Sequence, residues 1–145
     1  MAVRFLGTFH QTVDSKGRIF LPARFKRLLT PADLDRLTLI EGVEPCLILF
    51  PLSSWEQVQE EIDARPKGAE KRKAVRGLSL AAVDLELDAN GRLTLPRDFL
   101  QRAGIEREIE VVGQLRYIEL WSPARHAAAQ EEWRAASRTI LDEIL

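Results

Sequence analysis

A short motif occurs twice in this chain of 145 residues, and this repeat constrains the fold more than any other feature. The string Val-Asp-Ser-Lys-Gly-Arg-Ile-Phe-Leu-Pro-Ala-Arg-Phe at residues 13–25 is echoed by Leu-Asp-Ala-Asn-Gly-Arg-Leu-Thr-Leu-Pro-Arg-Asp-Phe at residues 87–99. The apolar segments 47–50 and 118–121 also correspond. The chain is therefore two copies of one unit of about 45 residues, which is too short to bury a sufficient core by itself. We expect the two copies to pack on each other.

Each copy predicts the same local structure around an Asp-x-x-Gly-Arg turn. An extended stretch with alternating apolar residues precedes the turn. Gly17 and Gly91 supply the positive φ that a tight hairpin needs, and the Asp14 and Asp88 carboxylates can accept hydrogen bonds from turn N–H groups. These four residues are the expected organisers of the two turns. A short strand follows each turn.

Helices and further strands complete each copy. We expect a helix from Pro22 to about residue 29 and another from Pro96 to about residue 103, because proline fits the first turn of a helix. Further strands are expected at 37–41, 46–50, 108–112 and 116–121. The string Ser-Ser-Trp-Glu at 53–56 predicts a capping box for a longer helix, which residues 66–68 interrupt. A second long helix is expected to begin at Ser122 and Pro123.

The expected organisation has four parts. Residues 7–54 form the first unit, 55–82 a helical linker, 83–126 the second unit and 127–145 a C-terminal helix. That helix carries an apolar stripe with Trp133, Ala136, Ile140, Leu141 and Ile144 at helical spacing, which predicts that the stripe lies in the core or in a subunit interface. The fold class is mainly β with flanking helices.

The net charge of −1 conceals two basic segments. Residues 1–27 carry six basic side chains against one acidic side chain, a net of +5. A second cluster at 65–76 has the same net charge. Basic clusters are often only solvated faces. The first cluster, however, coincides with the motif, whose arginine can bind guanine or phosphate through two hydrogen bonds.

These observations predict a DNA-binding surface. Arg18 is expected to read or clamp DNA, and Arg92 contributes from the second copy. Lys16, Arg24 and Lys26 are expected to neutralise phosphates. The alternative interpretation is that Arg18 and Arg92 only form exposed ion pairs with the aspartates of their own turns.

Other classes of function lack their sequence signals. Cys46, His10 and His126 are too few and too scattered for a metal cage, and no cofactor is expected. No histidine lies near either motif, and neither Asp14 nor Asp88 has a second carboxylate at the spacing of metal ligands, which argues against an enzyme. No segment is apolar enough for a membrane span or a signal peptide. We expect a cytoplasmic protein without a small-molecule substrate.

The doubled motif resembles the bacterial MraZ family, whose members carry two SpoVT-AbrB units, each with an Asp-x-x-x-Arg motif. The resemblance extends to Gly7, residues 46–51, Trp55, Arg76 and residues 118–121, and it covers nearly the whole chain. It implies a double-split β-barrel of the AbrB, MazE and MraZ type, built from two pseudo-symmetric halves. It also implies a ring-shaped homo-oligomer at the nucleoid, and transcriptional control at short G-rich direct repeats upstream of the division and cell-wall gene cluster. The DNA contacts it implies are Arg18 and Arg92.

A second hypothesis is a protein-interaction module, because AbrB-like folds also form the DNA-binding halves of antitoxins. The C-terminal helix would then bind the partner. Antitoxin tails tend to be disordered and acidic, whereas the apolar stripe at Trp133, Ile140 and Ile144 favours a docked helix.

Overall fold

The computed structural model describes residues 4–145. The first copy of the repeat forms β1 (Thr8–Thr12), β2 (Arg18–Phe20), α1 (Ala23–Lys26), α2 (Pro31–Leu34), β3 (Leu37–Glu41) and β4 (Leu47–Phe50). Two helices, α3 (Leu52–Asp63) and α4 (Ala69–Ala81), lead to the second copy. That copy forms β5 (Ala82–Leu85), β6 (Arg92–Thr94), α5 (Arg97–Arg102), β7 (Glu108–Gln114) and β8 (Tyr117–Trp121), and α6 (Pro123–Ile144) follows.

The two copies exchange their strands. A six-stranded antiparallel sheet has the order β1-β7-β8-β4-β3-β5, so the first strand of each copy pairs with the third strand of the other. β4 and β8 pair at the centre of this sheet, and β2 pairs with β6 in a separate two-stranded ribbon. This interleaving is the double-split β-barrel of two pseudo-symmetric halves that the family resemblance implies.

The tight hairpin expected at each motif is wrong in one respect. The strands before and after each turn do not pair with each other, because β1 pairs with β7 and β2 pairs with β6. The turns instead bind the opposite copy: Leu95 N–H donates to the Gly17 carbonyl at 2.8 Å, and Leu21 N–H donates to the Gly91 carbonyl at 3.1 Å. The two motif loops are therefore interlocked.

The core lies between the six-stranded sheet and the β2–β6 ribbon. Both copies contribute, with Ile19 and Leu93 facing inward from the ribbon beside Phe25 from α1 and Leu100 from α5. These side chains belong to one continuous cluster. Burial of apolar side chains at about 1.5–3 kcal/mol each makes this shared core the main stabilising contribution.

The first short helix ends at Lys26 and not at about residue 29. Leu28 N–H donates to the Phe25 carbonyl and Leu29 N–H to the Lys26 carbonyl, so the chain tightens into i+3 turns. Thr30 then begins a new helix, α2, because it precedes Pro31 and its side chain accepts from Asp33 N–H at 3.3 Å. The Asp33 side chain accepts from Thr30 N–H at 2.8 Å and completes a capping box.

The capping box expected at 53–56 is wrong, and Asp33 explains why. Helix α3 begins at Leu52 after Pro51, and Leu52 N–H donates to Asp33 Oδ1 at 2.8 Å. One buried carboxylate thus caps two helices. Ser54, released from that role, donates its hydroxyl proton to the Arg116 carbonyl in the second copy.

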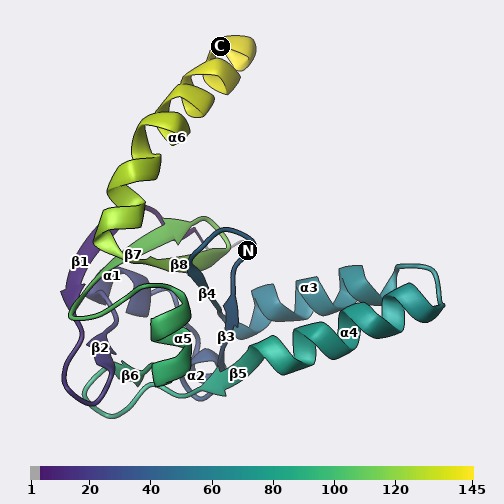
Figure 1. The fold of residues 1–145 in the computed structure, drawn as a ribbon, viewed down its shortest axis with the longest axis horizontal. Helices are drawn as coiled ribbons and strands as arrows, with labels where there is room; N and C mark the ends of the chain where they lie inside the picture. The colour runs from purple at the N-terminus through teal and green to yellow at the C-terminus, as the bar shows by residue number, and fades with distance from the viewer. Residues whose placement is uncertain (1–3) are drawn as a thin grey trace.

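Two elements project from the barrel in different directions (Figure 1). Helices α3 and α4 form a hairpin, with the expected break between Asp63 and Ala69. Helix α6 is capped by Ser122, as expected, and contacts the barrel through Trp133, whose ring lies 5.0 Å from that of Trp121. Beyond Trp133 the helix is exposed, so Ile140 and Ile144 are not part of the core of this chain.

The edge pairing of β1 with β7 carries a titratable contact between the copies. His10 lies opposite Glu110, with 2.8 Å between Nδ1 and Oε1, and its Nε2 lies 3.1 Å from Glu108 Oε1. The hydrogen bond to Glu110 raises the pKa of His10 above its ordinary 6.5, and the hydrogen bond to Glu108 adds to the increase. His10 therefore joins the two copies at this edge, and both glutamates favour its protonated form.

The interlocked loops predict unequal effects of two matched substitutions. Both glycines have positive φ, 81° at Gly17 and 80° at Gly91. A Cβ at residue 17 would lie 2.8 Å from the Leu95 carbonyl oxygen, whereas at residue 91 it would meet the mobile end of Lys26 at 3.2 Å. We expect Gly91→Ala to lower the free energy of unfolding by about 1 kcal/mol and Gly17→Ala by about 2–3 kcal/mol. Urea unfolding checks this order; equal losses would contradict the tight contact at Gly17.

The His10 contact predicts a pH dependence of stability. Because the pKa is higher in the folded chain, the contribution of the ion pairs is complete below pH 6.5 and is lost as pH rises through the folded-state pKa. Wild type should exceed His10→Gln in melting temperature at pH 5.5 to 6, and the difference should shrink towards pH 9. A difference that stays constant with pH would show that His10 contributes no charge.

Candidate nucleic-acid interface

The two motif loops have the same hydrogen bonds. Asp14 Oδ1 accepts from the N–H groups of Lys16 and Arg18 at 2.9 and 2.8 Å, and Gly17 N–H donates to the Asp14 carbonyl at 3.0 Å. In the second copy, Asp88 Oδ1 accepts from the N–H groups of Asn90 and Arg92, both at 2.9 Å. The short carboxylate thus fixes each loop from inside, in the role predicted for it.

The same carboxylates hold the two arginines. Arg18 Nε donates to Asp14 Oδ2 at 2.7 Å, and Arg92 Nε donates to Asp88 Oδ2 at 3.0 Å. The pKa of each aspartate is lowered, first by the backbone N–H of the arginine and further by its side chain. Both carboxylates are therefore ionised at neutral pH.

Arg18 and Arg92 do form ion pairs with the aspartates of their own turns, as the alternative interpretation predicts. These ion pairs leave most of each guanidinium group available. Within residues 4–145, Nε is the guanidinium nitrogen through which Arg18 and Arg92 hydrogen-bond, so Nη1 and Nη2 are available to an external acceptor. The side chains are 28% and 24% exposed. An arginine held by Nε and open at Nη1 and Nη2 presents an oriented pair of donors.

Arg18 and Arg92 are the first residues of the two ribbon strands, where the chain leaves each loop. Arg18 lies opposite Thr94 and Phe20 lies opposite Arg92 in the β2–β6 register. Directly opposed residues share a face of a ribbon, so these four side chains form its outer face, which we call the ribbon face. Ile19 and Leu93 point the other way, into the core.

Sequence reasoning missed Phe20 and Thr94. Phe20 is 54% exposed, and the Arg92 guanidinium carbon lies 5.9 Å from its ring centroid. An apolar ring that is kept in solvent beside a cation indicates a contact surface. The signal was available, because a strand that buries Ile19 must turn both Arg18 and Phe20 outward.

The other predicted residues surround the loops. Lys16 is exposed at the first tip, and Lys26 lies against Gly91 of the second copy. Arg24 stands apart, with its guanidinium carbon 5.6 Å from the ring centroid of Phe9. The structure therefore brings Lys26 and the two motif loops together around the ribbon face and leaves Arg24 on the side towards β1.

A groove beside the first loop adds two cations that the sequence did not single out. It encloses about 570 Å³ and is lined by Lys16 and Gly17 from the first copy and by Arg97 and Arg107 from the second. Both arginines are exposed. The positive charge beside the first loop therefore comes from both copies, although only the first copy has a basic segment in sequence.

Residues 4–145 contain no group of three or more His, Cys, Asp or Glu side chains placed to hold a metal ion. None of the helices in this range combines the length and the apolar character needed to cross a bilayer. Cys46 is buried, and this burial raises the pKa of its thiol to about 12.

Comparison with known proteins places both halves of the chain in one family. The family model described as "MraZ protein, putative antitoxin-like" matches residues 4–76 and again residues 78–143. A protein from Thermomicrobium roseum named "Transcriptional regulator MraZ" is 36% identical over 97% of this chain and 96% of its own length. Proteins of the same name from Marinomonas sp. and Limosilactobacillus fermentum are 35% and 34% identical, over 96% and 88% of this chain and 89% and 87% of their own lengths.

The two matched segments each contain one copy of the repeat, and the relatives align along almost the full length of the chain. The doubled Asp-x-x-Gly-Arg loop, the exchanged strands and these matches agree. This chain belongs to the MraZ family.

Proposed function

We propose that the protein is a transcriptional regulator, not an enzyme, and that it binds DNA through the ribbon face. The observation that carries this proposal is the pair of guanidinium groups, Arg18 and Arg92, each fixed by an aspartate on one two-stranded ribbon. The names of its relatives support regulation of transcription. Such a protein would act in the cytoplasm, at the nucleoid.

A two-stranded β-ribbon fits the major groove of B-DNA, which is about 12 Å wide. In this arrangement Arg18 donates from Nη1 and Nη2 to guanine O6 and N7, which accounts for a G-rich target. Phe20 beside it supplies an apolar contact to a base edge. Lys16, Arg24 and Lys26 contact phosphates, and Arg92 contributes from the second loop.

The target proposed for this regulator is a set of short G-rich direct repeats in the promoter of the division and cell-wall gene cluster, read by a ring-shaped homo-oligomer. The chemical inequality of the two loops supports direct repeats. The first loop has Lys16 and the second has Asn90, while Phe20 corresponds to Thr94. A palindrome would present equal half-sites to unequal loops. Subunits in a head-to-tail ring present the same loop in the same sense, which suits direct repeats.

The proposed contacts predict a loss of affinity without a loss of fold. Arg18→Ala should weaken specific binding by about 1–3 kcal/mol per engaged subunit, because it removes a two-bond base contact. Arg18→Lys should recover little, since an ammonium group lacks the planar pair of donors. Melting should change little, because an ion pair of this exposure contributes about 1 kcal/mol or less. Mobility shifts on the DNA upstream of the protein's own gene, with melting curves, measure both effects.

Arg138→Ala is the matched control, since it makes the same change on the exposed part of α6. It should leave affinity unchanged. Arg92→Ala should reduce DNA affinity less than Arg18→Ala, because the second loop has Asn90 where the first loop has the cation Lys16. Unchanged affinity of Arg18→Ala would remove the ribbon face from the proposed site, and a collapsed fold would show that its ion pair with Asp14 is structural.

The direct-repeat geometry predicts a dependence on spacing. Neighbouring subunits meet the same groove after one helical turn of about 10 bp. Insertion of half a turn between repeats should reduce affinity strongly, whereas a full-turn insertion should be better tolerated. Equal binding to both DNAs, or to an inverted repeat, would contradict head-to-tail reading. Fluorescence anisotropy with labelled duplexes of equal length gives the comparison.

A further inference from the structure

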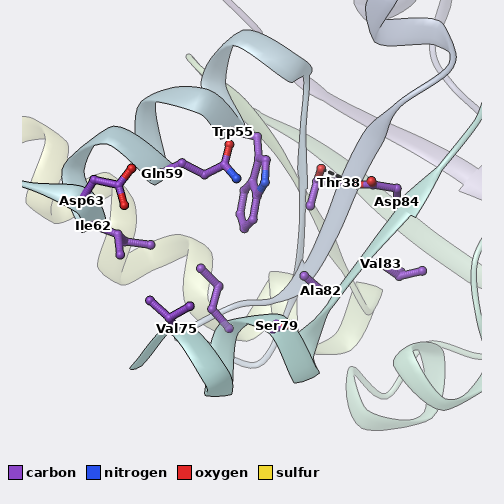
Figure 2. Close-up of a pocket in the computed structure, with 11 residues that line it drawn as sticks. Thr38, Trp55, Gln59, Ile62, Asp63, Val75, Ser79, Ala82, Val83 and Asp84 are labelled. Atoms are coloured by element: carbon purple, nitrogen blue, oxygen red, sulfur yellow. Dashed lines mark hydrogen bonds between the residues drawn. The ribbon is translucent and has the colours of Figure 1, made fainter. Parts of the chain in front are cut away.

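The helical hairpin α3–α4 has an uncovered groove with apolar side chains from both helices. A hollow of about 400 Å³ lies between the two helices and is lined by Trp55, Ile62, Val75 and Leu78, with polar side chains that include Gln59 and Asp63. Figure 2 shows side chains from α3 and from α4 on either side of it. A second hollow shares Val75 and is bordered by Arg72 and Arg76. We call these two hollows the hairpin groove.

Little within the chain covers the hairpin. Helix α4 has no fully buried residue, and α3 has only Ser54. Val75 is 45% exposed. A hairpin with so few buried contacts has little tertiary support, and most helical stability in proteins comes from such packing.

Trp133 packs partly against Trp121, and the rest of the outer half of α6 is uncovered. Every residue from 131 to 145 is exposed. Trp133, Ala136, Ile140 and Ile144 repeat at three- and four-residue spacing, so they form one face of the helix, which we call the α6 stripe. Ile144 is 71% exposed. A contiguous apolar face of this kind marks an interaction site.

The charges beside these two surfaces are complementary. Glu132 and Glu143 are eleven residues apart, about three helical turns, and therefore border the same side of the α6 stripe. Arg72 and Arg76 border the hairpin groove on the α4 side. Arg134 borders the opposite side of the stripe.

The acidic and basic sides of the groove match the two sides of the stripe. Helix α3 carries four acidic residues and no basic residue, and its Asp63 lines the groove. An α6 helix whose acidic side faces α4 therefore turns Arg134 towards α3. Opposite charges meet on both sides of the apolar contact in this one orientation.

The lengths also agree. Fourteen residues of helix after Gln130 and the 13 residues of α4 each span about 20 Å at about 1.5 Å per residue. Within one chain the two elements leave the barrel in different directions (Figure 1). The helix that fits the groove is therefore that of another copy.

We propose that the α6 stripe of one copy docks in the hairpin groove of a second copy. This is a helix-in-groove contact with anchors at i, i+3, i+7 and i+11. Each chain has one α6 stripe and one hairpin groove, so the contact joins two unlike surfaces. Such a heterologous contact repeats from copy to copy. It gives the basic cluster at 65–76 a role in assembly, and it does not depend on DNA.

The first test measures the mass of the particle by sedimentation velocity without DNA. Ile140→Glu on the stripe and Val75→Glu in the groove should each shift the mass towards that of a single chain. Ala135→Glu adds the same charge to α6 at an exposed residue away from the stripe and should leave the mass unchanged. Circular dichroism verifies that each variant retains its helices.

The results separate the possible occupants of the groove. Wild type that sediments as a single chain would overturn the proposal. Dissociation by Ile140→Glu but not by Val75→Glu would also overturn it, because α6 would then pair with another α6 or with a different protein. Since these measurements contain no DNA, their failure leaves the proposed DNA contact standing.

A charge exchange tests the orientation. One variant combines Glu132→Lys with Glu143→Lys, and the other combines Arg72→Glu with Arg76→Glu. Each alone should weaken self-association at least tenfold. An equimolar mixture should assemble again, since the reversed helix of the first meets the reversed groove of the second, and the native helix meets the native groove. A mixture that stays dissociated would overturn the pairing of these two edges.

Discussion

The pairing of β2 with β6 is the contact on which the rest of this structure depends. Each strand has three residues, and an isolated two-stranded ribbon of this length is not stable in water. It is held because Ile19 and Leu93 on its inner face are almost completely buried in a core drawn from both copies. The outer face of the same six residues carries the arginines. Closing the core and presenting the cations are therefore one structural event, and neither copy achieves either alone.

Each motif aspartate has two functions that belong together. Its Oδ1 atom orders the loop through two backbone N–H groups, and its Oδ2 atom holds the arginine through Nε. A side chain that is already oriented loses less conformational entropy on binding, so the ion pair prepares Arg18 for an external acceptor. The ion pair does not exclude the proposed DNA contact, because the pair uses Nε and leaves Nη1 and Nη2 of each guanidinium to an external acceptor. The same geometry recurs at Asp88 and Arg92.

Local patterns in the sequence predict most helices and strands. The pairing of strands and some helix caps depend on contacts between distant residues, which local patterns do not show. Strand β3, the break before α4 and the Ser122 cap follow from alternation, turn residues and capping preferences, which are local. The sequence of one copy does not show that β2 pairs with the other copy rather than with β1. Nor does it show that Asp33 accepts from Leu52 N–H, 19 residues away, and so replaces the capping box expected at 53–56. The cations were predicted from their charge. The outward direction of Phe20 follows from the burial of its neighbour Ile19 in the same strand.

The two copies share a backbone but not a surface, and burial explains the difference. Residues that point inward are apolar in both copies, as Ile19 and Leu93 are. Both fill one core, in which a change of side-chain volume lowers stability. Outward positions have no such constraint: Lys16 corresponds to Asn90, Phe20 to Thr94 and Arg24 to Asp98. The pseudo-two-fold axis thus relates a strongly basic loop to a weakly basic one. A chain of this kind has a direction along any surface it binds, and an assembly of such chains retains that direction when each contact joins unlike elements.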